Sequence, residues 1–320
     1  MSHAASAPRG RSVTVQVPAT SANLGPGFDT FGLALSLYDE LTVTVRDEPG
    51  AHVEVIGIGA GEVPTDETNL VVTAIAHTFR SLGREMPGID VVARNAIPHG
   101  RGLGSSGAAI VSGIMAAKGL LRGIVDIDAL GLLALATEME GHPDNVAPAL
   151  FGGLTIAWVT PEGPQSKKLM VHRGVSPLVF VPEHVMSTAL ARSLQPLQVP
   201  HADAVFNLSR SALLVAALTQ SPELLLAATE DKLHQSYRAS AMPETHRLVT
   251  MLRENGFAAV VSGAGPSVLV LCSDPGQRLA AAALVASNSE SRWQALMLAV
   301  DFKGATVSVT DLAASALPGS

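Results

Sequence analysis

Apolar and polar residues alternate along three early segments of the chain, at residues 13–17, 41–46 and 52–57. Alternation with a period of two predicts strands that bury one face, and β-branched residues are frequent in all three segments. After the polar segment 66–68, a typical helix start, the apolar spacing becomes helical and predicts a helix at 69–82. Strands that follow one another before the first helix favour an α+β fold over a doubly wound sheet.

Strands and helices continue to interleave through both halves of the chain. A segment rich in proline, glycine and lysine at residues 161–168 is the best candidate for a domain boundary. We therefore expect an N-terminal domain at 13–165, a C-terminal domain at 166–312, and disordered tails at 1–12 and 313–320. Further strands are expected at 88–96, 153–159, 178–181, 258–262, 267–272, 295–301 and 305–309, and further helices at 105–121, 127–140, 145–150, 201–218, 222–229, 244–255 and 275–287.

Composition narrows the function classes. A chain of 320 residues, 47% of them hydrophobic, can bury two sizeable cores, and its net charge of −7 argues against a nucleic-acid partner. The one cysteine, Cys272, cannot form an internal disulfide, which suits a reducing compartment. Residues 1–11 lack the apolar core of a signal peptide, and apolar runs such as 212–218 are too short to span a bilayer. We expect a cytoplasmic protein with no membrane or nucleic-acid partner.

The most informative motif is the glycine-rich loop at residues 98–108, which leads into an apolar helix. A helix start of this kind leaves several backbone N–H groups without partners, and together with the helix dipole they attract anions, phosphate above all. The loop contains no lysine and does not fit the Walker A spacing. The candidate ATP-phosphate ligands are Pro98, His99, Gly100, Arg101, Gly102, Leu103, Gly104, Ser105, Ser106, Gly107 and Ala108.

Two other interpretations of this loop stay open on its residues alone. Gly102, Gly104 and Gly107 also spell G-x-G-x-x-G, and Asp126 stands about twenty residues on, where a dinucleotide-binding unit has its ribose-binding acid. Residues 98–101 separate the glycines from the preceding strand, and the unit lies in the middle of the chain, which weakens the NAD interpretation. The third interpretation is a tight turn whose small residues allow close helix packing.

Two further glycine-rich turns lie elsewhere in the chain. Residues 18–32 follow the first strand and place polar residues, among them Asn23 and Asp29, beside glycines that permit close backbone approach. Residues 262–267 join two apolar strands in the other half. Taken singly, residues 18–32 are compatible with an irregular loop and residues 262–267 with a plain hairpin turn.

Together, the three loops resemble those of the GHMP kinase superfamily, and Pro-Ala-Thr-Ser-Ala-Asn-Leu-Gly-Pro-Gly-Phe-Asp at 18–29 is typical of its homoserine kinase branch. Residues 141–153, 188–196 and 231–238 are similar to further motifs of that branch, in the same order, so the resemblance covers most of the chain. One departure is Gly107, where the family usually has alanine. The resemblance implies a GHMP kinase fold of α+β class, with a ribosomal-protein-like N-terminal domain, a ferredoxin-like C-terminal domain and the site in the cleft between them.

The resemblance also implies an activity, the transfer of the γ-phosphate of ATP to the side-chain hydroxyl of L-homoserine in threonine biosynthesis. Phosphoryl transfer depends mainly on positioning and charge neutralisation. By similarity, Ser106 and Glu138 are expected at Mg²⁺, a cation that prefers oxygen ligands, and Asn69 beside the adenine. Glu140 remains open as an alternative metal ligand. Family habit suggests a homodimer.

Homoserine has a carboxylate, an ammonium and a hydroxyl group. Arg192 and Arg238 are the expected carboxylate clamp, because a guanidinium meets a carboxylate in a two-point fork. The motifs show no counterpart of the catalytic aspartate of mevalonate kinase, so we expect positioning to carry most of the rate and the proton to leave to the phosphate. The expected substrate-binding residues are Asn23, Asp29, His142, Asn145, Thr188, Arg192, Arg238 and Gly265, and the expected catalytic residues are Ser106, Glu138 and Asn145.

Two alternative functions are weighed against this one. The first is another GHMP kinase that acts on a different alcohol. The second is a non-catalytic sensor with this fold, which loss of the metal carboxylate or of the loop serines would favour. Both of these features are present in the sequence.

Overall fold

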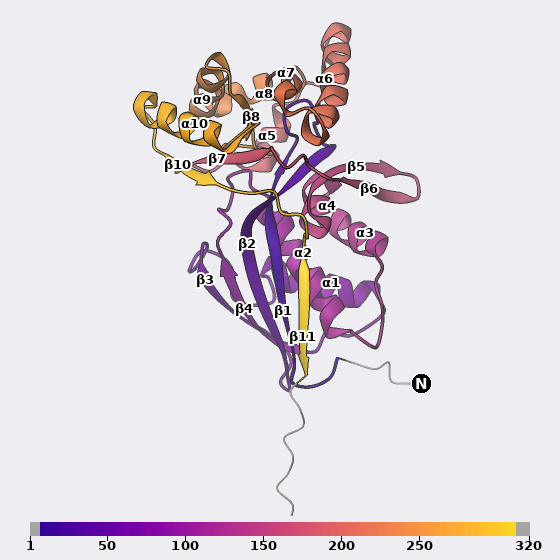
Figure 1. The fold of residues 1–320 in the computed structure, drawn as a ribbon. Coiled ribbons are helices and arrows are strands. Elements are labelled where there is room, and N and C mark those ends of the chain that lie inside the picture. Colours follow the sequence, from indigo (N-terminus) through magenta and orange to yellow (C-terminus); the bar gives the residue numbers. More distant parts are fainter. Residues whose placement is uncertain (1–6, 312–320) are drawn as a thin grey trace, which may run out of the picture.

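Two sheets organise the chain in the computed structural model, which describes residues 7–311 (Figure 1). The first sheet contains β1 (Arg11–Ala22), β2 (Phe31–Arg46), β3 (Ala51–Gly57), β4 (Gly88–Asn95), β5 (Leu154–Thr160), β6 (Gly163–Leu169) and β11 (Thr306–Asp311). The second contains β7 (Ser176–Pro182), β8 (Ala258–Val261), β9 (Val268–Cys272) and β10 (Trp293–Met297). The structure has two hydrophobic clusters, as expected for two cores, and the larger one extends from the first sheet to residues of the second such as Val179 and Leu269.

The first sheet is built around the long hairpin of β1 and β2, in the order β11-β1-β2-β4-β3 with β5 and β6 attached to β2. Val13, Val15 and Val17 point into the core, as their alternation predicts. Beyond a bulge between Pro18 and Ala19, β1 continues to pair with β2 as far as Ala22. Much of the expected loop at 18–32 is therefore strand, and only its tip is a turn.

Four helices pack together beside the first sheet: α1 (Leu70–Ser81), α2 (Ser105–Leu120), α3 (Ala129–Glu140) and α4 (Pro143–Phe151) (Figure 1). Helix α2 is apolar on nearly all sides and contacts β1, β2, α1, α3 and α4. A helix that is buried all round forms the centre of a core. It therefore holds its own N-terminus, and the glycine loop before it, in a fixed place.

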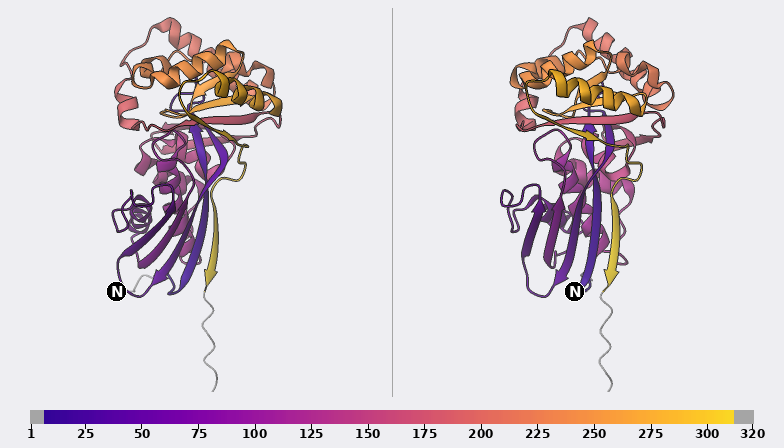
Figure 2. Two further views of the ribbon diagram at one scale, coloured as in Figure 1. Left: turned by 90° about the vertical axis from the view of Figure 1, so that its left-hand side faces the viewer. Right: turned by 60° about the vertical axis from the view of Figure 1, so that its left-hand side comes forward.

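The second sheet has the order β10-β7-β9-β8 with antiparallel neighbours throughout. Its helices are α5 (Thr188–Ser193), α6 (His201–Thr219), α7 (Leu225–Ala228), α8 (Gln235–Arg238), α9 (Pro243–Glu254) and α10 (Pro275–Asn288). Helices α9 and α10 pack on the sheet, and the order strand–helices–strand–strand–helix–strand is the ferredoxin-like arrangement that was expected. This domain lies over one end of β1 and β2 (Figures 1 and 2).

The expected domain boundaries need correction at three places. The boundary at 165/166 falls inside β6, because the Pro/Gly/Lys-rich segment forms an exposed hairpin with β5 rather than a linker. Strand β11, expected in the C-terminal domain, pairs with β1 in the first sheet. Arg11 and Ser12, expected in a tail, begin β1. The rest of that tail up to residue 6, and residues 312–320, lie outside the described residues.

Within residues 7–311, one helix, α6, is long and apolar enough to span a membrane. The apolar run 212–218, which by itself is too short for a span, forms only part of this helix. Core and surface helices of other folds also meet that criterion. Asn207 Nδ2 and Ser211 Oγ, both on α6, donate to the Pro26 carbonyl at 2.8 and 2.7 Å. The helix is thus tied by hydrogen bonds to the N-terminal domain.

Candidate active site

The glycine-rich loop ends at a helix start with free backbone donors. Gly104 is the N-cap of α2, has φ 70°, and makes no side-chain cap hydrogen bond. The first intrahelical bond runs from Ala108 N to Gly104 O, so the preceding N–H groups have no helical acceptor. A Cβ at residue 104 would lie 2.0 Å from Thr20 Oγ1, so both the space and the backbone angle require glycine.

The three glycine-rich motifs meet around this loop. Ser262 Oγ donates to Gly102 O at 2.7 Å and lies 2.9 Å from Ser21 Oγ. Arg101 Nε donates to Pro182 O at 2.9 Å, which ties the loop to the C-terminal domain. The loop is therefore fixed by both domains at their junction.

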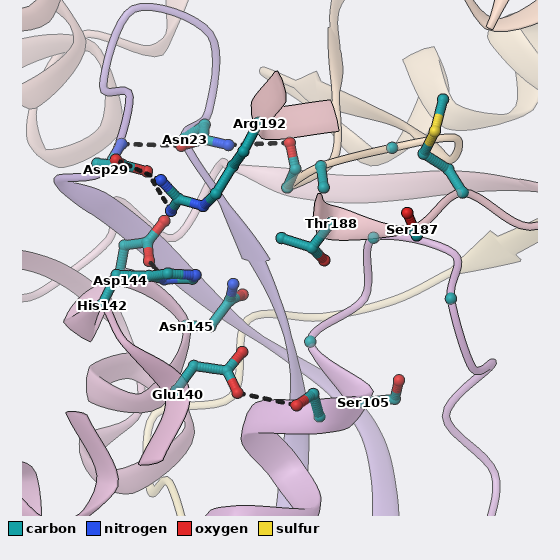
Figure 3. A pocket seen from close by; sticks show the side chains of 18 of the residues that line it. Asn23, Asp29, Ser105, Glu140, His142, Asp144, Asn145, Ser187, Thr188 and Arg192 are labelled. Atoms are coloured by element: carbon teal, nitrogen blue, oxygen red, sulfur yellow. Dashed lines mark hydrogen bonds and ion pairs between the residues drawn. The ribbon is translucent and has the colours of Figure 1, made fainter. Parts of the chain in front are cut away.

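A first cavity of about 200 Å³ opens at this junction (Figure 3). All eight residues expected to bind substrate line it, together with Gly100, Gly102, Gly104, Ser105 and Ser106 from the glycine loop. Sequence reasoning did not assign Asp144, Ser187 or Gly263, which also line it. The site was expected in the cleft between the two domains, and this cavity combines residues from both.

The two expected arginines have different surroundings. Arg192 forms a two-point ion pair with Asp29, at 2.9 and 3.1 Å, so its fork already faces a carboxylate (Figure 3). Arg238 is 2% exposed and donates to Gly263 O at 3.3 Å. Burial lowers the pKa of its guanidinium, and among residues 7–311 no carboxylate lies within ion-pair distance of it. Arg238 is thus a buried cation that forms no ion pair among the described residues.

Glu138, the expected metal ligand, does not reach the cavity. Its side chain is 68% exposed and pairs with His77 at 3.4 Å. Glu140, the alternative, lines the cavity and accepts a 2.8 Å hydrogen bond from Ser106 Oγ. Burial raises the pKa of Glu140, although the Ser106 hydrogen bond opposes the shift. The structure therefore brings Glu140, and not Glu138, beside Ser106, because the last residue of α3 faces the start of α2.

The raised pKa of Glu140 predicts a stability effect in metal-free protein. A group whose folded-state pKa is raised destabilises the fold, relative to low pH, as the pH rises through that pKa. Glu140→Gln removes this penalty and is expected to increase Tm by about 2 °C at pH 8 but not at about pH 4, below the ordinary pKa of the carboxyl group. Thermal unfolding in EDTA at both pH values measures the difference, and Glu138→Gln is the control. An equal gain at the lower pH contradicts the prediction.

His142 and Asp144 form a close pair at the start of α4 (Figure 3). The Asp144 side chain is 3% exposed, and that of His142 is 16% exposed. Burial disfavours the charged imidazole, but the hydrogen bond and charge of Asp144 outweigh it and raise the pKa of His142. Asn145 follows them and accepts a 3.0 Å hydrogen bond from Thr20 Oγ1.

A second cavity, of about 290 Å³, adjoins the first and shares Ser105 and Ser106 with it. Asn69 and His99 line it, as the expectation of a nucleotide site requires. Asn69 caps α1 by accepting from Val71 N at 2.9 Å. The apolar residues in its lining, which sequence reasoning did not assign, are Leu41, Val55, Val63, Leu70, Val71, Ala93 and Ala109.

Five residues of the expected phosphate loop line neither cavity: Pro98, Arg101, Leu103, Gly107 and Ala108. Leu103 is fully buried, and the Arg101 side chain is used on backbone carbonyls of the C-terminal domain. Asp126, the acid of the NAD interpretation, is 92% exposed and pairs with Lys118 at 3.6 Å beyond the far end of α2. It lines neither of the two cavities at the helix start.

Comparisons with known proteins agree with this geometry. The family models for the GHMP kinases N terminal domain and GHMP kinases C terminal match residues 69–153 and 211–289. The homoserine kinase of Leifsonia xyli subsp. xyli is 82% identical over 93% of this chain and 92% of its own, and that of Clavibacter michiganensis subsp. michiganensis is 78% identical over 94% and 96%. This chain belongs to the homoserine kinase family of GHMP kinases.

Solved structures support the fold of this homoserine kinase family member. Homoserine kinase from Cytophaga hutchinsonii aligns with a TM-score of 0.82 at 28% identity, covering 93% of this chain and 97% of that one. L. major mevalonate kinase, solved with R-mevalonate, aligns with a TM-score of 0.69 at 16% identity over 94% and 98% of the two chains, which shows a common fold.

Proposed function

We propose that this chain, as a homoserine kinase, transfers the γ-phosphoryl group of ATP to the side-chain hydroxyl of L-homoserine. The observation that carries the proposal is the pair of adjoining cavities that share Ser105 and Ser106 at the free end of α2. The apolar cavity suits a nucleobase, and the polar cavity, with its buried arginine, suits a small zwitterion. The phosphates would lie between them, at the helix N-terminus.

Within the polar cavity, the charges are arranged for the two ends of an amino acid. Arg238 is the natural partner of the substrate carboxylate, because it is buried and has no carboxylate of its own among the described residues. Asp29 offers the substrate ammonium a carboxylate whose position Arg192 fixes. Asn23, whose Oδ1 accepts from Asp29 N at 2.9 Å, and Thr188 complete the polar lining.

Ser106 and Glu140 fit the requirements of Mg²⁺. A partly buried carboxylate that forms no ion pair favours a cation beside it, and among the described residues Glu140 is such a group. The described residues contain no cluster of three acidic or metal-ligating side chains, which agrees with a cation that keeps waters and takes its remaining ligands from phosphate. Bound there, Mg²⁺ would neutralise the charge that develops on the transferred phosphoryl group.

The lining residues favour direct transfer without a protein base. His142 and Asp144 are engaged with each other, so neither side chain is free to take the hydroxyl proton. Asn145 has no basic group and is placed to hold the hydroxyl. The hydroxyl oxygen therefore attacks the γ-phosphorus, the bond to ADP breaks, and the proton passes to a phosphoryl oxygen.

The finer parts of the proposal are a cytoplasmic location and a homodimer. The buried, unpaired Cys272 suits a reducing compartment. Exposed apolar side chains at and before the start of α6, those of Leu197, Val205 and Leu208, offer a surface that a second copy would cover. Light scattering of the purified protein tests the dimer.

A coupled ADP-release assay tests the activity. We expect turnover with L-homoserine and MgATP, and rates lower by about 10²-fold or more with mevalonate or galactose, because the charged groups would lose partners. Threonine keeps both charged groups, but its hydroxyl is one carbon closer to them, so we expect a similar loss of rate from poorer positioning. Phosphorus NMR of the product identifies the ester. A pure protein that is inactive on homoserine but active on another of these alcohols would replace the substrate assignment.

A further inference from the structure

The turn between β1 and β2 carries Asn23 and Asp29 into the polar cavity with an unfavourable backbone. Asn23, Leu24 and Asp29 have φ angles of 71°, 52° and 53°, in the left-handed region that residues with side chains rarely occupy. Such conformations persist only where the surroundings enforce them, and they concentrate at functional sites. The contacts that enforce this turn therefore matter for the site.

Those contacts come from the C-terminal domain and reach the two carbonyls at the tip of the turn. His234 Nε2 lies 2.7 Å from Gly25 O, and Asn207 Nδ2 donates to Pro26 O at 2.8 Å. The space around the tip is full, since a Cβ at Gly25 would lie 2.6 Å from Thr229 O. The turn is thus held from across the domain junction by specific donors.

His234 is suited to be a fixed donor. It is fully buried, and its ring stacks on Phe28, with centroids 5.1 Å apart and planes 22° apart. A carbonyl accepts only from a protonated nitrogen, so the proton of the neutral ring is on Nε2, while Nδ1 has no partner among the described residues. Burial lowers the pKa of His234, although the Asp231 charge opposes this, which keeps the ring in that neutral form.

Asp231 and Arg238 lie at the two ends of the 231–238 motif, which also contains His234. Asp231 is buried and accepts from the backbone N–H groups of Leu233, His234 and Gln235, at 2.9, 3.1 and 2.8 Å, so it shapes the backbone that carries His234. At the other end, the Arg238 guanidinium lies 5.2 Å from the centre of the Phe28 ring. Phe28 therefore contacts both the donor and the buried arginine of the cavity.

We propose that His234 and Asn207 are positioning residues for the amino-acid substrate, which hold the 23–29 turn in its strained shape through hydrogen bonds to Gly25 O and Pro26 O. The inference rests on the proposed function, because it takes the polar cavity as the homoserine site. Asn23 and Asp29 lie in that cavity and not in the apolar one. Ser211 Oγ is a second donor to Pro26 O, at 2.7 Å. Loss of the His234 donor, or of both donors to Pro26 O, therefore weakens homoserine binding and leaves nucleotide binding nearly unchanged.

The test compares two substitutions at residue 234 in the full-length enzyme. His234→Phe keeps a ring against Phe28 but removes the donor, whereas His234→Gln restores a donor near the position of Nε2. For His234→Phe we expect the KM for homoserine to rise about tenfold at saturating MgATP, with the KM for ATP within about twofold of wild type. For His234→Gln we expect the KM for homoserine to return to within about threefold of wild type.

The double variant Asn207→Asp/Ser211→Ala serves for the case that His234→Phe does not fold, since it removes both donors to Pro26 O, Asn207 Nδ2 and Ser211 Oγ. It should show the same selective rise in the KM for homoserine. Ala212→Ser, at another exposed position of α6, is the control and should behave as wild type.

Wild-type activity on homoserine, measured in parallel, distinguishes a failure of the proposed function from a failure of the positioning role. Absence of that activity overturns the proposed function. An active wild type together with equal rises in both KM values, or with an unchanged KM for homoserine in folded donor-loss variants, overturns the positioning role. A Gln variant no better than the Phe variant also overturns it.

Discussion

Glu140→Gln is expected to lower kcat by about a hundredfold or more, while the protein stays folded. The substitution keeps the acceptor for Ser106 Oγ, whose hydrogen bond to Glu140 is 2.8 Å long, but removes the charge that Mg²⁺ requires. Less of the phosphoryl charge is then neutralised in the transition state. Initial rates at saturating homoserine and ATP measure the loss, and a titration with Mg²⁺ should restore part of it.

Glu138→Gln is the matched control, two residues away on the same helix. Its carboxylate is exposed and faces His77, so kcat should remain within about twofold of wild type. If Glu138→Gln were the more damaging substitution, the assignment of Glu140 to the metal would be wrong, and α3 would have to turn its other face to α2 during catalysis.

Arg238→Met is expected to raise the KM for homoserine between tenfold and a hundredfold, with little change in the KM for ATP. Methionine fills much of the same space, so the variant loses mainly the charged hydrogen bonds to the carboxylate, which are worth about 1.5–3 kcal/mol. Varying each substrate at saturation of the other separates the two constants.

Arg192→Met should have a smaller effect than Arg238→Met, because Arg192 acts on the substrate partly through Asp29. Arg253→Met is a control for the loss of a half-buried arginine outside the cavity; it bonds to Ala259 O and Leu226 O. A larger loss of homoserine affinity in Arg192→Met than in Arg238→Met would move the carboxylate site toward Arg192.

The sequence predicted the regular elements where local pattern decides them, and missed those that distant residues decide. The alternation at 13–17 predicted the start of β1, but its continuation beyond Pro18 depends on pairing with residues 32–38, and the irregular, polar sequence at 19–23 does not suggest it. The hairpin strand β6 has few apolar residues, so its sequence predicts a linker instead of a strand.

The eight residues that motif similarity predicted for the substrate all line the polar cavity, but the similarity did not decide between Glu138 and Glu140. Residues two apart on a helix point to nearly opposite sides, so the choice depends on how α3 is rotated against α2. Asp144 belongs to the same motif as His142 and Asn145, but only the structure shows that it is buried and paired with His142. The His234 contact with Gly25 joins residues 209 positions apart, which no local pattern reports.

Strand β11 has a consequence for how the chain is completed during synthesis. It pairs with β1 along Arg11–Gln16, so the first strand to leave the ribosome meets its outer neighbour only when residues 306–311 emerge (Figure 2). Until then, β1 presents an open edge, the kind of surface that invites pairing with another chain. Domains usually fold in the order of synthesis, but here the first domain is closed last, after the whole of the second. A nascent or truncated chain that ends before residue 306 would therefore expose the edge of the long strand β1 to other chains, whereas in the finished enzyme the edge of the sheet is the short strand β11.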